Sequence, residues 1–526
     1  MKWLQGSCVA LTLSWVTLRQ LQDSADVQER QESGRSAEPV SPESNDIVSQ
    51  AGTKDCIASI SDTPNPIRND QSTAVQEWPT VKKIAIAGVI CLYTFVVYAS
   101  SAIYIIGIPD IMLEFNVTEQ GALLGLSLFV LAYGFGPLLW APLSELDFIG
   151  RSPVYGLTFI IFLGMSILVS TAKTWTAFLI LRFLQGFFGS PCLANGGASM
   201  HDLFPDMTLP YYLAVWIAAA YCGPALGPLI SGFLVPQKGW RYGMWEIVWM
   251  TAPTLVLVLL LPETYDPAIK VRNNRRRSVL SVQNTDATHS THKSRIRLVS
   301  RAIRDAIVKP VQITLQDPAV AVANLYTSFV YGTYYTFFDA FPRVYLFKYY
   351  FTFGELGLAF LSIFVACVLG GGLYCCYTKW FHNEKLRQKA VQPHEECLHP
   401  ALIACVLPPI GLFLFGWTAH RSIHWIVSLL GVTIYATGVY IILQCLSVYL
   451  PRIYPRYAAS LFAANDLCRS VAAAGLIHAG VPLYGRLGIE KGISVLGAIS
   501  VLGIPGMWFI YLQGPTLRAK SRFVEK

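Results

Sequence analysis

Arg182 is an arginine inside a long apolar stretch, LRFLQGFFGSPCLANGG at residues 181–197. A charged side chain in the hydrocarbon of a membrane is costly, so its presence indicates a functional role. Because a guanidinium does not readily lose its proton, Arg182 is not expected to carry a proton itself. It could instead bias proton release from a nearby carboxylate or orient a water molecule, with Gln185 sharing the network from almost one helical turn away. The alternative is a structural arginine that binds carbonyl groups across helices.

A charged hairpin lies between two apolar stretches shortly before this segment. It contains Glu145, Asp147 and Arg151 within the sequence LSELDFIGRSP. An acid that pairs with Arg151 in one conformation and releases it in another would act as an electrostatic latch between moving helices. The alternative is a charged turn that only fixes the orientation of its two flanking helices in a membrane.

Four carboxylates at or within apolar stretches are candidates for carrying a proton: Asp110, Glu246, Asp339 and Asp466. Asp466 lies three residues before Arg469, so the two can neutralise each other on one helix face, which favours a structural role. Asp339 ends the aromatic run VYGTYYTFFD. It could accept a proton or a cationic compound, or it could be a hydrated residue at the mouth of a helix.

Aromatic residues make up 13% of the chain, and many of them lie in apolar stretches. Most are expected to pack in the bilayer or in the protein core. Some tyrosines could instead line a central cavity with few fixed charges, which would suit large, apolar or weakly cationic compounds rather than polyanions. The candidates are Tyr98, Tyr133, Tyr221 and Tyr335, together with Tyr93 and Tyr440.

Glycines and prolines recur in the sequence YCGPALGPLISG at residues 221–232. Small residues four positions apart let neighbouring helices approach closely, while prolines free carbonyl groups and permit bending. The segment is therefore predicted to be a hinge, with simple close packing as the alternative. The residues concerned are Gly223, Pro224, Gly227, Pro228 and Gly232.

Long apolar helices must hold these residues in place. The chain has 526 residues, of which 53% are hydrophobic and 14% are charged, against roughly 25% charged residues in soluble proteins. A membrane β-barrel would show short alternating segments rather than long apolar runs. The sequence therefore predicts an all-α polytopic membrane protein with twelve transmembrane helices, six on each side of a long loop. The stretches long enough to cross a bilayer lie roughly at 84–106, 121–143, 153–171, 175–197, 211–234, 243–261, 319–341, 355–376, 400–418, 425–447, 458–478 and 491–512.

The segments outside these helices complete the domain organisation. The N-terminal tail is rich in Ser, Gln, Asp and Glu and is predicted to be disordered, although its residues 1–18 resemble a weak signal peptide. The predicted parts are a tail at 1–80, a first half at 81–262, a basic central loop at 263–316, a second half at 317–512 and a tail at 513–526.

Lys and Arg residues indicate how these helices are oriented. They concentrate in the central loop and in alternate connections, which predicts that both termini lie in the cytosol. Asn116, in the sequon Asn-Val-Thr, then falls in the first outside loop and is a candidate for glycosylation.

Sequence motifs for nucleotide or zinc chemistry are absent. The chain has no G-x-x-x-x-G-K-[ST] and no H-E-x-x-H, so neither a nucleotide-driven pump nor a zinc hydrolase is expected. The basic runs RRRS and HKSRIRLVSRAIR are expected to lie against the anionic inner leaflet, not on nucleic acid. His394, Cys397 and His399 lie near Glu395, but without a second ligand cluster a solvated loop is favoured over a metal site. No cofactor is predicted.

Several motifs together resemble the major facilitator superfamily, and within it the fungal branch of twelve-span drug:proton antiporters. The resemblance extends over about residues 62–523, apart from most of the two long loops. Departures include Ser152, where a second basic residue is usual, and Asp339, where a glutamate is typical. The motifs are GPLLWAPLSELDFIGRSPVYG at 136–156, Arg182 with Gln185 and Gly186, YCGPALGPLISG at 221–232, GWRYGMWE at 239–246, LPET at 261–264, VYGTYYTFFDAFPRVY at 330–345 and FAANDLCRS at 462–470.

This resemblance implies the major facilitator fold and a function. The expected function is proton-coupled export of lipophilic or weakly cationic small molecules, such as drugs, toxins or secondary metabolites, across the plasma membrane by a non-enzymatic monomer. The alternatives are a polyamine or organic-cation transporter of the same fold and a non-transporting membrane sensor. The implied site residues are Arg182, Gln185 and Asp339 for proton coupling, and Asn465, Asp466 and Arg469 as a second-half motif.

Overall fold

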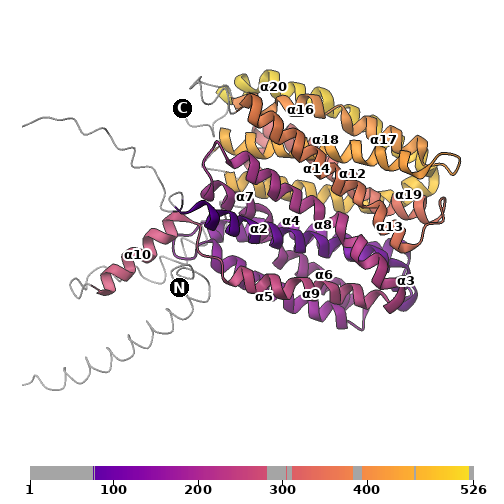
Figure 1. Ribbon diagram of the computed structural model, residues 1–526, viewed down its shortest axis with the longest axis horizontal. Helices are drawn as coiled ribbons and strands as arrows, with labels where there is room; N and C mark the ends of the chain where they lie inside the picture. Colours follow the sequence, from indigo (N-terminus) through magenta and orange to yellow (C-terminus); the bar gives the residue numbers. More distant parts are fainter. Residues whose placement is uncertain are drawn as a thin grey trace, which may run out of the picture.

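The computed structural model of the chain describes residues 78–280, 311–382, 394–454 and 458–520, together with residues 75, 304 and 308. These residues form one elongated bundle of helices, most of which run along its long axis (Figure 1). The prediction of an all-α fold is therefore confirmed. The predicted tail at 1–80, apart from its last residues, and residues 281–303 of the central loop lie outside the described residues.

The first group of helices accounts for the first six predicted spans. In the first span, helix α2 continues through a 3₁₀ turn into a short helix, α3, that has Pro109 in its first turn. The fourth span is interrupted at Ser190, directly before Pro191. The elements are α2 (Thr80–Ala102), η2 (Ile103–Gly107), α3 (Ile108–Phe115), α4 (Glu119–Ser144), α5 (Arg151–Thr171), α6 (Trp175–Gly189), α7 (Pro191–Leu203), α8 (Leu209–Lys238) and α9 (Trp240–Leu259), followed by α10 (Asp266–Leu280).

The second group of helices accounts for the other six spans. The long helix α19 is two helices joined at a kink, because Gly488 has a φ of 78°. The predicted tail at 513–526 begins inside a helix, since α20 continues to Lys520. The elements are α12 (Pro318–Phe341), η3 (Pro342–Leu346), α13 (Phe353–Ala359), α14 (Leu361–Tyr377), η4 (Thr378–His382), η5 (His394–Leu398), α16 (His399–Ala404), α17 (Leu407–Thr418), α18 (Trp425–Ile453), α19 (Ala458–Val501) and α20 (Gly503–Lys520).

Hydropathy supports the assignment of these helices to a membrane. Within the described residues, 10 helical segments are long and apolar enough to cross one. The segment Leu461–Leu517 counts as one of these but contains two crossings, one before and one after Gly488. Helix α12 adds a further, less apolar crossing that is rich in Tyr and Thr. The described residues therefore contain the twelve predicted spans.

Helix packing relates the two groups to each other. In each group the first and fifth spans pack together, as α2 on α8 and as α12 on α19. Between the groups, α4 packs on α19, and α8 packs on α13 and α14. The second span of each group thus contacts the fifth span of the other group, which is the reciprocal arrangement expected of two related halves.

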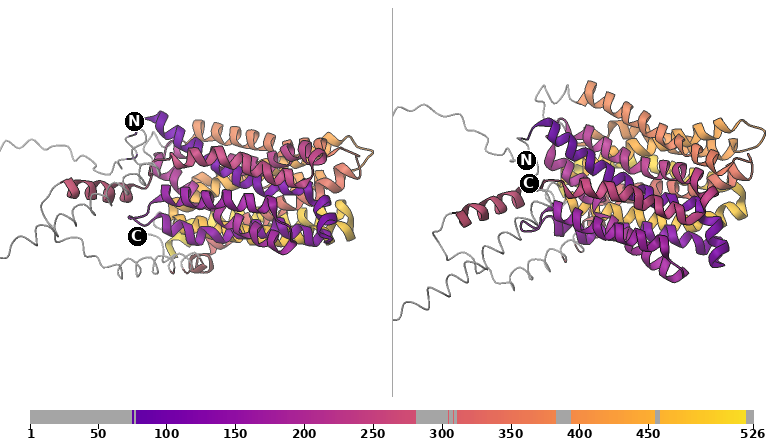
Figure 2. Two further views of the ribbon diagram at one scale, coloured as in Figure 1. Left: turned by 90° about the horizontal axis from the view of Figure 1, so that it is seen from below. Right: turned by 60° about the horizontal axis from the view of Figure 1, so that its bottom comes forward.

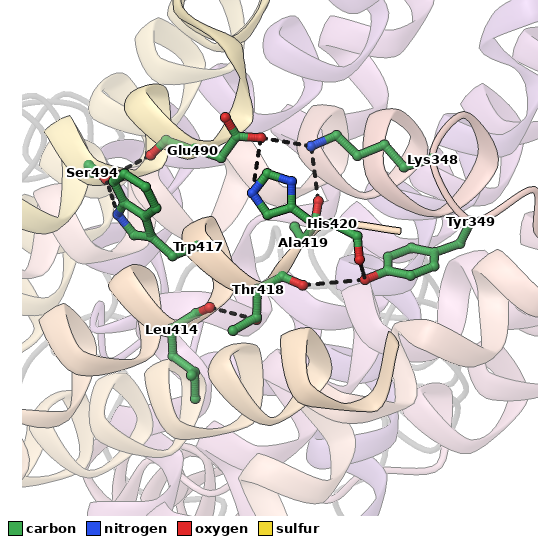
Figure 3. Close-up of polar contacts among 9 residues, drawn as sticks. All are labelled: Lys348, Tyr349, Leu414, Trp417, Thr418, Ala419, His420, Glu490 and Ser494. Atoms are coloured by element: carbon green, nitrogen blue, oxygen red, sulfur yellow. Dashed lines mark hydrogen bonds and ion pairs between the residues drawn. The ribbon is translucent and has the colours of Figure 1, made fainter. Parts of the chain in front are cut away.

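The bundle has two distinct ends. Helix α2 begins and helix α20 finishes at the same end, from which α10 also projects, and we call it the terminal end (Figures 1 and 2). The opposite end, where α3 lies, is called the distal end. In the second half, a polar cluster joins the connections at the distal end, because Glu490 accepts a hydrogen bond from Lys348 at 3.0 Å and lies 3.5 Å from His420 (Figure 3).

Candidate functional site

Arg182 is fully buried in the first half, where its guanidinium joins three helices. It donates to the carbonyl oxygen of Ser100 in α2 and to that of Gly125 in α4, both at 3.2 Å. It also donates to Oε1 of Gln185 at 3.0 Å within α6. The guanidinium carbon lies 5.0 Å from the ring centre of Tyr104 and 4.8 Å from that of Phe129.

These partners bear on the roles that the sequence suggested for Arg182. From its sequence, Arg182 could bias proton release from a nearby carboxylate, orient a water molecule, or bind carbonyl groups across helices. Among the described residues, however, no ion pair of Arg182 is formed, and carbonyl and amide oxygens take its hydrogen bonds. Arg182 therefore has no carboxylate partner here, and its contacts fit the structural alternative, because the facing stretches of α2 and α4 are uncharged; its part in proton coupling stays a prediction. Gln185 does share the network, since its amide donates to Ser166 Oγ at 2.8 Å.

Arg151 lies in a buried network at the terminal end of the first half. Its guanidinium pairs with Asp202 of α7 at 3.0 Å and donates to the carbonyl of Asn195 at 3.2 Å. The predicted partners Glu145 and Asp147 form no ion pair within the described residues. The reason is geometric: Arg151 is the first residue of α5, and its side chain extends toward α7 rather than back along the hairpin.

Tyr265 lies beside the same network, with its ring centre 5.7 Å from the guanidinium carbon of Arg151. Burial and the surrounding carboxylates, Glu145 foremost among them, raise the pKa of the Tyr265 phenol to about 12. The phenol is therefore neutral at physiological pH and presents its ring to the arginine.

Glu263, which is 3% exposed, holds the start of α5. Its carboxylate accepts hydrogen bonds from the backbone N–H groups of Arg151 at 2.8 Å and Ser152 at 3.3 Å, and it lies 3.4 Å from Arg272. A carboxylate at a helix N-terminus satisfies unpaired N–H groups and interacts favourably with the helix dipole. From the sequence, Glu263 stood out only as part of the LPET motif, because the backbone N–H groups that it binds lie more than a hundred residues earlier in the chain.

Gly150 is the residue that allows this contact. It has a φ of 80°, and a Cβ atom placed there would lie 2.2 Å from Oε2 of Glu263. We predict that Gly150→Ala lowers the free energy of unfolding by about 2 kcal/mol or more, because it adds both backbone strain and a clash. The thermal unfolding midpoint of purified protein measures this effect.

A matched control for Gly150→Ala is available in the same helix. A Cβ on Gly164 of α5 would meet no atom within 4 Å. Gly164→Ala should therefore be neutral or stabilising, since alanine is favoured over glycine inside helices. Equal midpoints for the two variants would contradict the proposed close contact between Gly150 and Glu263.

Tyrosines from both halves meet at the centre of the bundle. Tyr133 of α4 forms hydrogen bonds through its hydroxyl with Tyr331 and Tyr335 of α12, the latter at 2.9 Å. The ring of Tyr98 lies 5.6 Å from that of Tyr133, and Tyr221 lies 5.4 Å from Tyr334, which itself packs on Tyr335. We call these six residues the tyrosine cluster. It brings together the four principal predicted tyrosines and adds Tyr331 and Tyr334, but their rings pack closely on one another.

Two further tyrosines that the sequence suggested lie elsewhere. The hydroxyl of Tyr93 donates to Gly189 at 3.3 Å inside the first half. Tyr440 of α18 donates to the carbonyl of Ala214 in α8 at 2.6 Å, and its neighbour Gln444 donates to Pro210 at 2.9 Å. Tyr440 therefore joins the halves on the terminal side of the tyrosine cluster.

The ion pair that the spacing of Asp466 and Arg469 predicted is present next to this cluster. Both residues lie in α19 and both are largely buried. The guanidinium carbon of Arg469 also lies 4.8 Å from the ring centre of Tyr331. Next to the tyrosine cluster, the interface thus contains a cation and an anion that compensate each other.

Asn465, the third residue of this motif, makes its contacts within its own half, with helix α12. Its amide donates to Asn324 at 2.9 Å and to Thr327 at 2.7 Å. Asn465 and Thr327 also line a small pocket whose other walls are mostly apolar. Those walls are formed by Leu443, Leu446, Ser447, Leu450, Pro451, Leu461 and Phe462.

Asp339 takes part in a link between the halves at the distal end. Arg343 donates to Asp339 one turn earlier in the chain at 2.7 Å and to Glu119 at the start of α4 at 2.8 Å. The arginine therefore joins a carboxylate of each half.

Glu246, in contrast, is 2% exposed in α9, and neither of its carboxylate oxygens has a hydrogen-bond partner among the described residues.

The predicted hinge glycines of α8 lie at close contacts between backbones. A Cβ on Gly223 would lie 2.8 Å from the backbone nitrogen of Ala99, and one on Gly227 would lie 2.9 Å from the carbonyl oxygen of Ala99. A Cβ on Gly232 would lie 2.7 Å from the carbonyl oxygen of Phe353 in the other half. Pro224 and Pro228 lie inside the same unbroken helix. The close packing is thus present, and bending remains a prediction.

Other residues singled out in the sequence have local roles. Asn116 ends α3 in a left-handed conformation and lies, exposed, in the short connection to α4 at the distal end. His399 lies between two hydroxyls, Tyr377 at 3.3 Å and Tyr511 at 3.0 Å. In the part of the chain that the structure describes, no three His, Cys, Asp or Glu side chains are grouped in a way that could hold a metal ion.

Two six-span halves, joined by a polar and aromatic interface, define a helical membrane protein of the two-half carrier class. A family model described as Major Facilitator Superfamily matches residues 90–477 of the chain. The chain therefore belongs to the major facilitator superfamily. Among solved structures, it is similar to the proton:xylose symporter XylE, with a TM-score of 0.59 and 14% identity over 82% of this chain and 97% of that one, which supports the fold.

Relatives of known name lie among fungal transporters. The chain is 40% identical over 448 residues to the MFS-type transporter pyvG of Aspergillus violaceofuscus, covering 85% of this chain and 82% of that protein. It is 35% identical over 457 residues to the cycloheximide resistance protein of Candida maltosa, covering 85% and 83%. It is 33% identical over 461 residues to fluconazole resistance protein 1 of Saccharomyces cerevisiae, covering 86% and 83%. The family resemblance inferred from the motifs is thus confirmed.

Proposed function

We propose that the chain exports lipophilic or weakly cationic small molecules in exchange for protons. The observation that carries this proposal is the character of the interface between the halves. The tyrosine cluster offers aromatic faces and hydroxyl groups, and the adjacent charges of Asp466 and Arg469 compensate each other. Such a surface, once opened, favours apolar and weakly polar compounds over polyanions. The names of the drug-resistance relatives point in the same direction.

Transport would proceed by rocking of residues 81–262 against residues 317–512. The contact at the distal end through Arg343 and the contacts of Tyr440 and Gln444 nearer the terminal end both join the halves. Each set would have to open in turn for alternating access. The buried pair of Arg151 with Asp202 would act as the latch for helix movements at the terminal end, in place of the pairing with Glu145 or Asp147.

We place the terminal end in the cytosol and the distal end outside, in a monomeric, multi-pass protein of the plasma membrane. The distribution of Lys and Arg supports this orientation. A glycan on Asn116 would mark the distal end as external, and Asn116→Gln would remove it. The protein would make and break no covalent bonds and would need no cofactor.

Glu246 is better placed than Asp339 to carry the coupling proton. Asp339 already has a cationic partner in Arg343, whereas Glu246 is buried without a hydrogen-bond partner among the described residues. A buried carboxyl group without a partner is more stable as the neutral acid, and it can be ionised only when its surroundings change. Such a group can therefore couple protonation to a conformational change. In this proposal Asp339 serves the contact at the distal end.

We predict that Glu246→Gln removes proton-driven export while it preserves folding, because glutamine keeps the shape of the neutral acid but cannot release a proton. The expected result is that gradient-driven accumulation falls to the level of protein-free liposomes. Accumulation of a probe in acid-loaded proteoliposomes measures this export. Asp110→Asn is the control, since Asp110 is exposed near the distal end and should not matter. Loss of export in Asp339→Asn but not in Glu246→Gln would return the coupling role to Asp339.

The transport proposal itself is tested with purified protein in proteoliposomes whose lumen is more acidic than the bath. Radiolabelled cycloheximide, fluconazole and spermidine are supplied outside, and their accumulation is compared with that in protein-free liposomes and after the pH gradient is collapsed. Gradient-dependent accumulation of the first two supports the proposal. Accumulation of spermidine alone would favour the polyamine carrier. No gradient-dependent flux of any probe would contradict proton-coupled export of this class.

A further inference from the structure

His478 links the two halves near the distal end of α19. One ring nitrogen, Nε2, lies 2.8 Å from Ser127 Oγ, and the other, Nδ1, lies 3.0 Å from Gln120 Oε1. Both partners belong to α4 in the first half. The amide of Gln120 also donates through Nε2 to the carbonyl oxygen of His478 at 3.2 Å. One residue of the second half is therefore held at three polar atoms by the first half.

Pro482 explains why the carbonyl of His478 is available. In a helix, this carbonyl would accept a hydrogen bond from the N–H of the residue four positions later, which is Pro482 and has none. Gln120 supplies the missing donor. Since a carbonyl can only accept, the amide nitrogen of Gln120 must face it, and this leaves Oε1 of Gln120 facing the imidazole ring.

The protonation state of His478 follows from these partners. Because Gln120 Oε1 can only accept, Nδ1 of His478 must carry a hydrogen. In the neutral ring Nε2 then has to accept from the hydroxyl of Ser127, which also lies 3.4 Å from the carbonyl of Leu124. In the charged ring Nε2 donates to Ser127, and the hydroxyl is free to donate to Leu124. Both contacts of the ring are kept in either state, but protonation replaces two neutral hydrogen bonds by charge-assisted ones, which are stronger, and lets Ser127 also donate to Leu124.

We propose that His478, with Gln120 and Ser127, forms a proton-operated clasp that holds the distal ends of the two halves together when the imidazole is charged. His478 is half-buried, and Gln120 is exposed at the beginning of α4, so a proton from the distal side can reach the ring. The clasp rests on the proposed function for its purpose. In an exporter that takes up external protons, protonation from outside would close the distal side and return the protein to its inward-facing state.

Other charged and titratable groups lie near His478, and protonation of the carboxylates among them would have the opposite effect on the distal end. Those on the packed elements are Glu119 on α4, Asp339 on α12, Arg343 on η3, and Tyr484 on α19 itself, which donates to Thr336 at 2.8 Å. Arg343 bridges the two carboxylates, so protonation of either carboxylate would weaken that bridge and open the distal side. Acidification that closes the distal side therefore indicates His478, and acidification that opens it indicates Glu119 or Asp339.

The clasp is tested by measuring the separation of the distal ends directly. Nitroxide labels on p-acetylphenylalanine at Leu113 and Leu487, both exposed, leave the native cysteines unchanged. Electron–electron distance measurements on full-length protein in nanodiscs then give the ratio of closed to open populations. Between pH 7.5 and pH 5.5, where imidazole changes its charge, we expect this ratio to rise about fivefold in the unmodified chain.

Two variants and one control identify the residue responsible. His478→Ala and Gln120→Ala should each lower the pH effect to below about twofold, and combining them should lower it no further, as for two residues of one contact. Gln120 is exposed, so its replacement removes the clasp with little risk to folding. His420→Gln is the control, because the imidazole of His420 lies 3.5 Å from Glu490 in its own half (Figure 3), and replacing this side chain should leave the response unchanged.

The outcomes separate the clasp from the transport proposal, because the distances do not depend on any transported compound. A closed population that is independent of pH, that falls on acidification, or that still responds in His478→Ala would overturn the clasp. A normal response in a protein that moves no probe would contradict proton-coupled export and leave the clasp in place.

Discussion

Arg182→Ala is expected to abolish transport, lowering the initial rate of proton-driven export by about a hundredfold, which corresponds to the loss of roughly two hydrogen bonds to a charged group. The guanidinium holds α2, α4 and α6 together through Ser100, Gly125 and Gln185. Alanine would remove one donor from each of these three acceptors and would open a cavity between the rings of Tyr104 and Phe129. Probe accumulation in proteoliposomes measures the rate.

Surface expression and the thermal unfolding midpoint must be recorded for the same variant. A loss of transport with an unchanged midpoint would give Arg182 a direct role in the conformational cycle. Normal transport with a lowered midpoint would make it a structural arginine. Arg182→Lys is the informative companion, because lysine keeps the charge but cannot reach several acceptors with one planar group. Gln185→Leu removes a single partner and should have a smaller effect than either.

The arrangement of spans was predictable from the sequence, because each span needs about twenty apolar residues and this signal is local. The boundaries were less predictable where a helix continues past the apolar run. The loop expected at 107–120 is mostly helix α3, since Glu114 accepts hydrogen bonds from Trp240 and Arg241, both at 2.6 Å, and so ties this turn to α9. These partners are far apart in the chain, and hydropathy does not reveal them.

The candidate site was predictable in its residue types more than in its contacts. Tyr133 and Tyr335 could be named from their aromatic surroundings, yet their hydrogen bond depends on how α4 packs against α12. Arg151 could be named as a charge, but its partner Asp202 lies in another helix and carries no sequence signal. His478 was not singled out at all. Its only local signal is Pro482 four residues later, which frees the carbonyl that Gln120 binds.

Asp466→Asn is expected to cause the largest loss of stability, about 3–5 kcal/mol, because it removes one partner of a buried ion pair and leaves the other charge uncompensated. Arg469 would then lie at the interface of the halves without its anionic partner, and it would keep its cation–π contact with the ring of Tyr331. The expected result is a lower unfolding midpoint and little monodisperse protein. The same measurement on Asn465→Ala, which removes two neutral hydrogen bonds instead, should show a smaller loss.

Removal of both charges separates stability from function at this pair. The double variant with Asp466→Leu and Arg469→Leu leaves no uncompensated charge, so it should be more stable than Asp466→Asn, as replaced buried ion pairs often are. If the double variant also transports, the pair serves only to fold α19. If it folds but does not transport, the cation of Arg469 acts on the tyrosine cluster during the cycle, where it contacts Tyr331. A double variant as unstable as the single one would contradict the compensation of charges on which this reasoning depends.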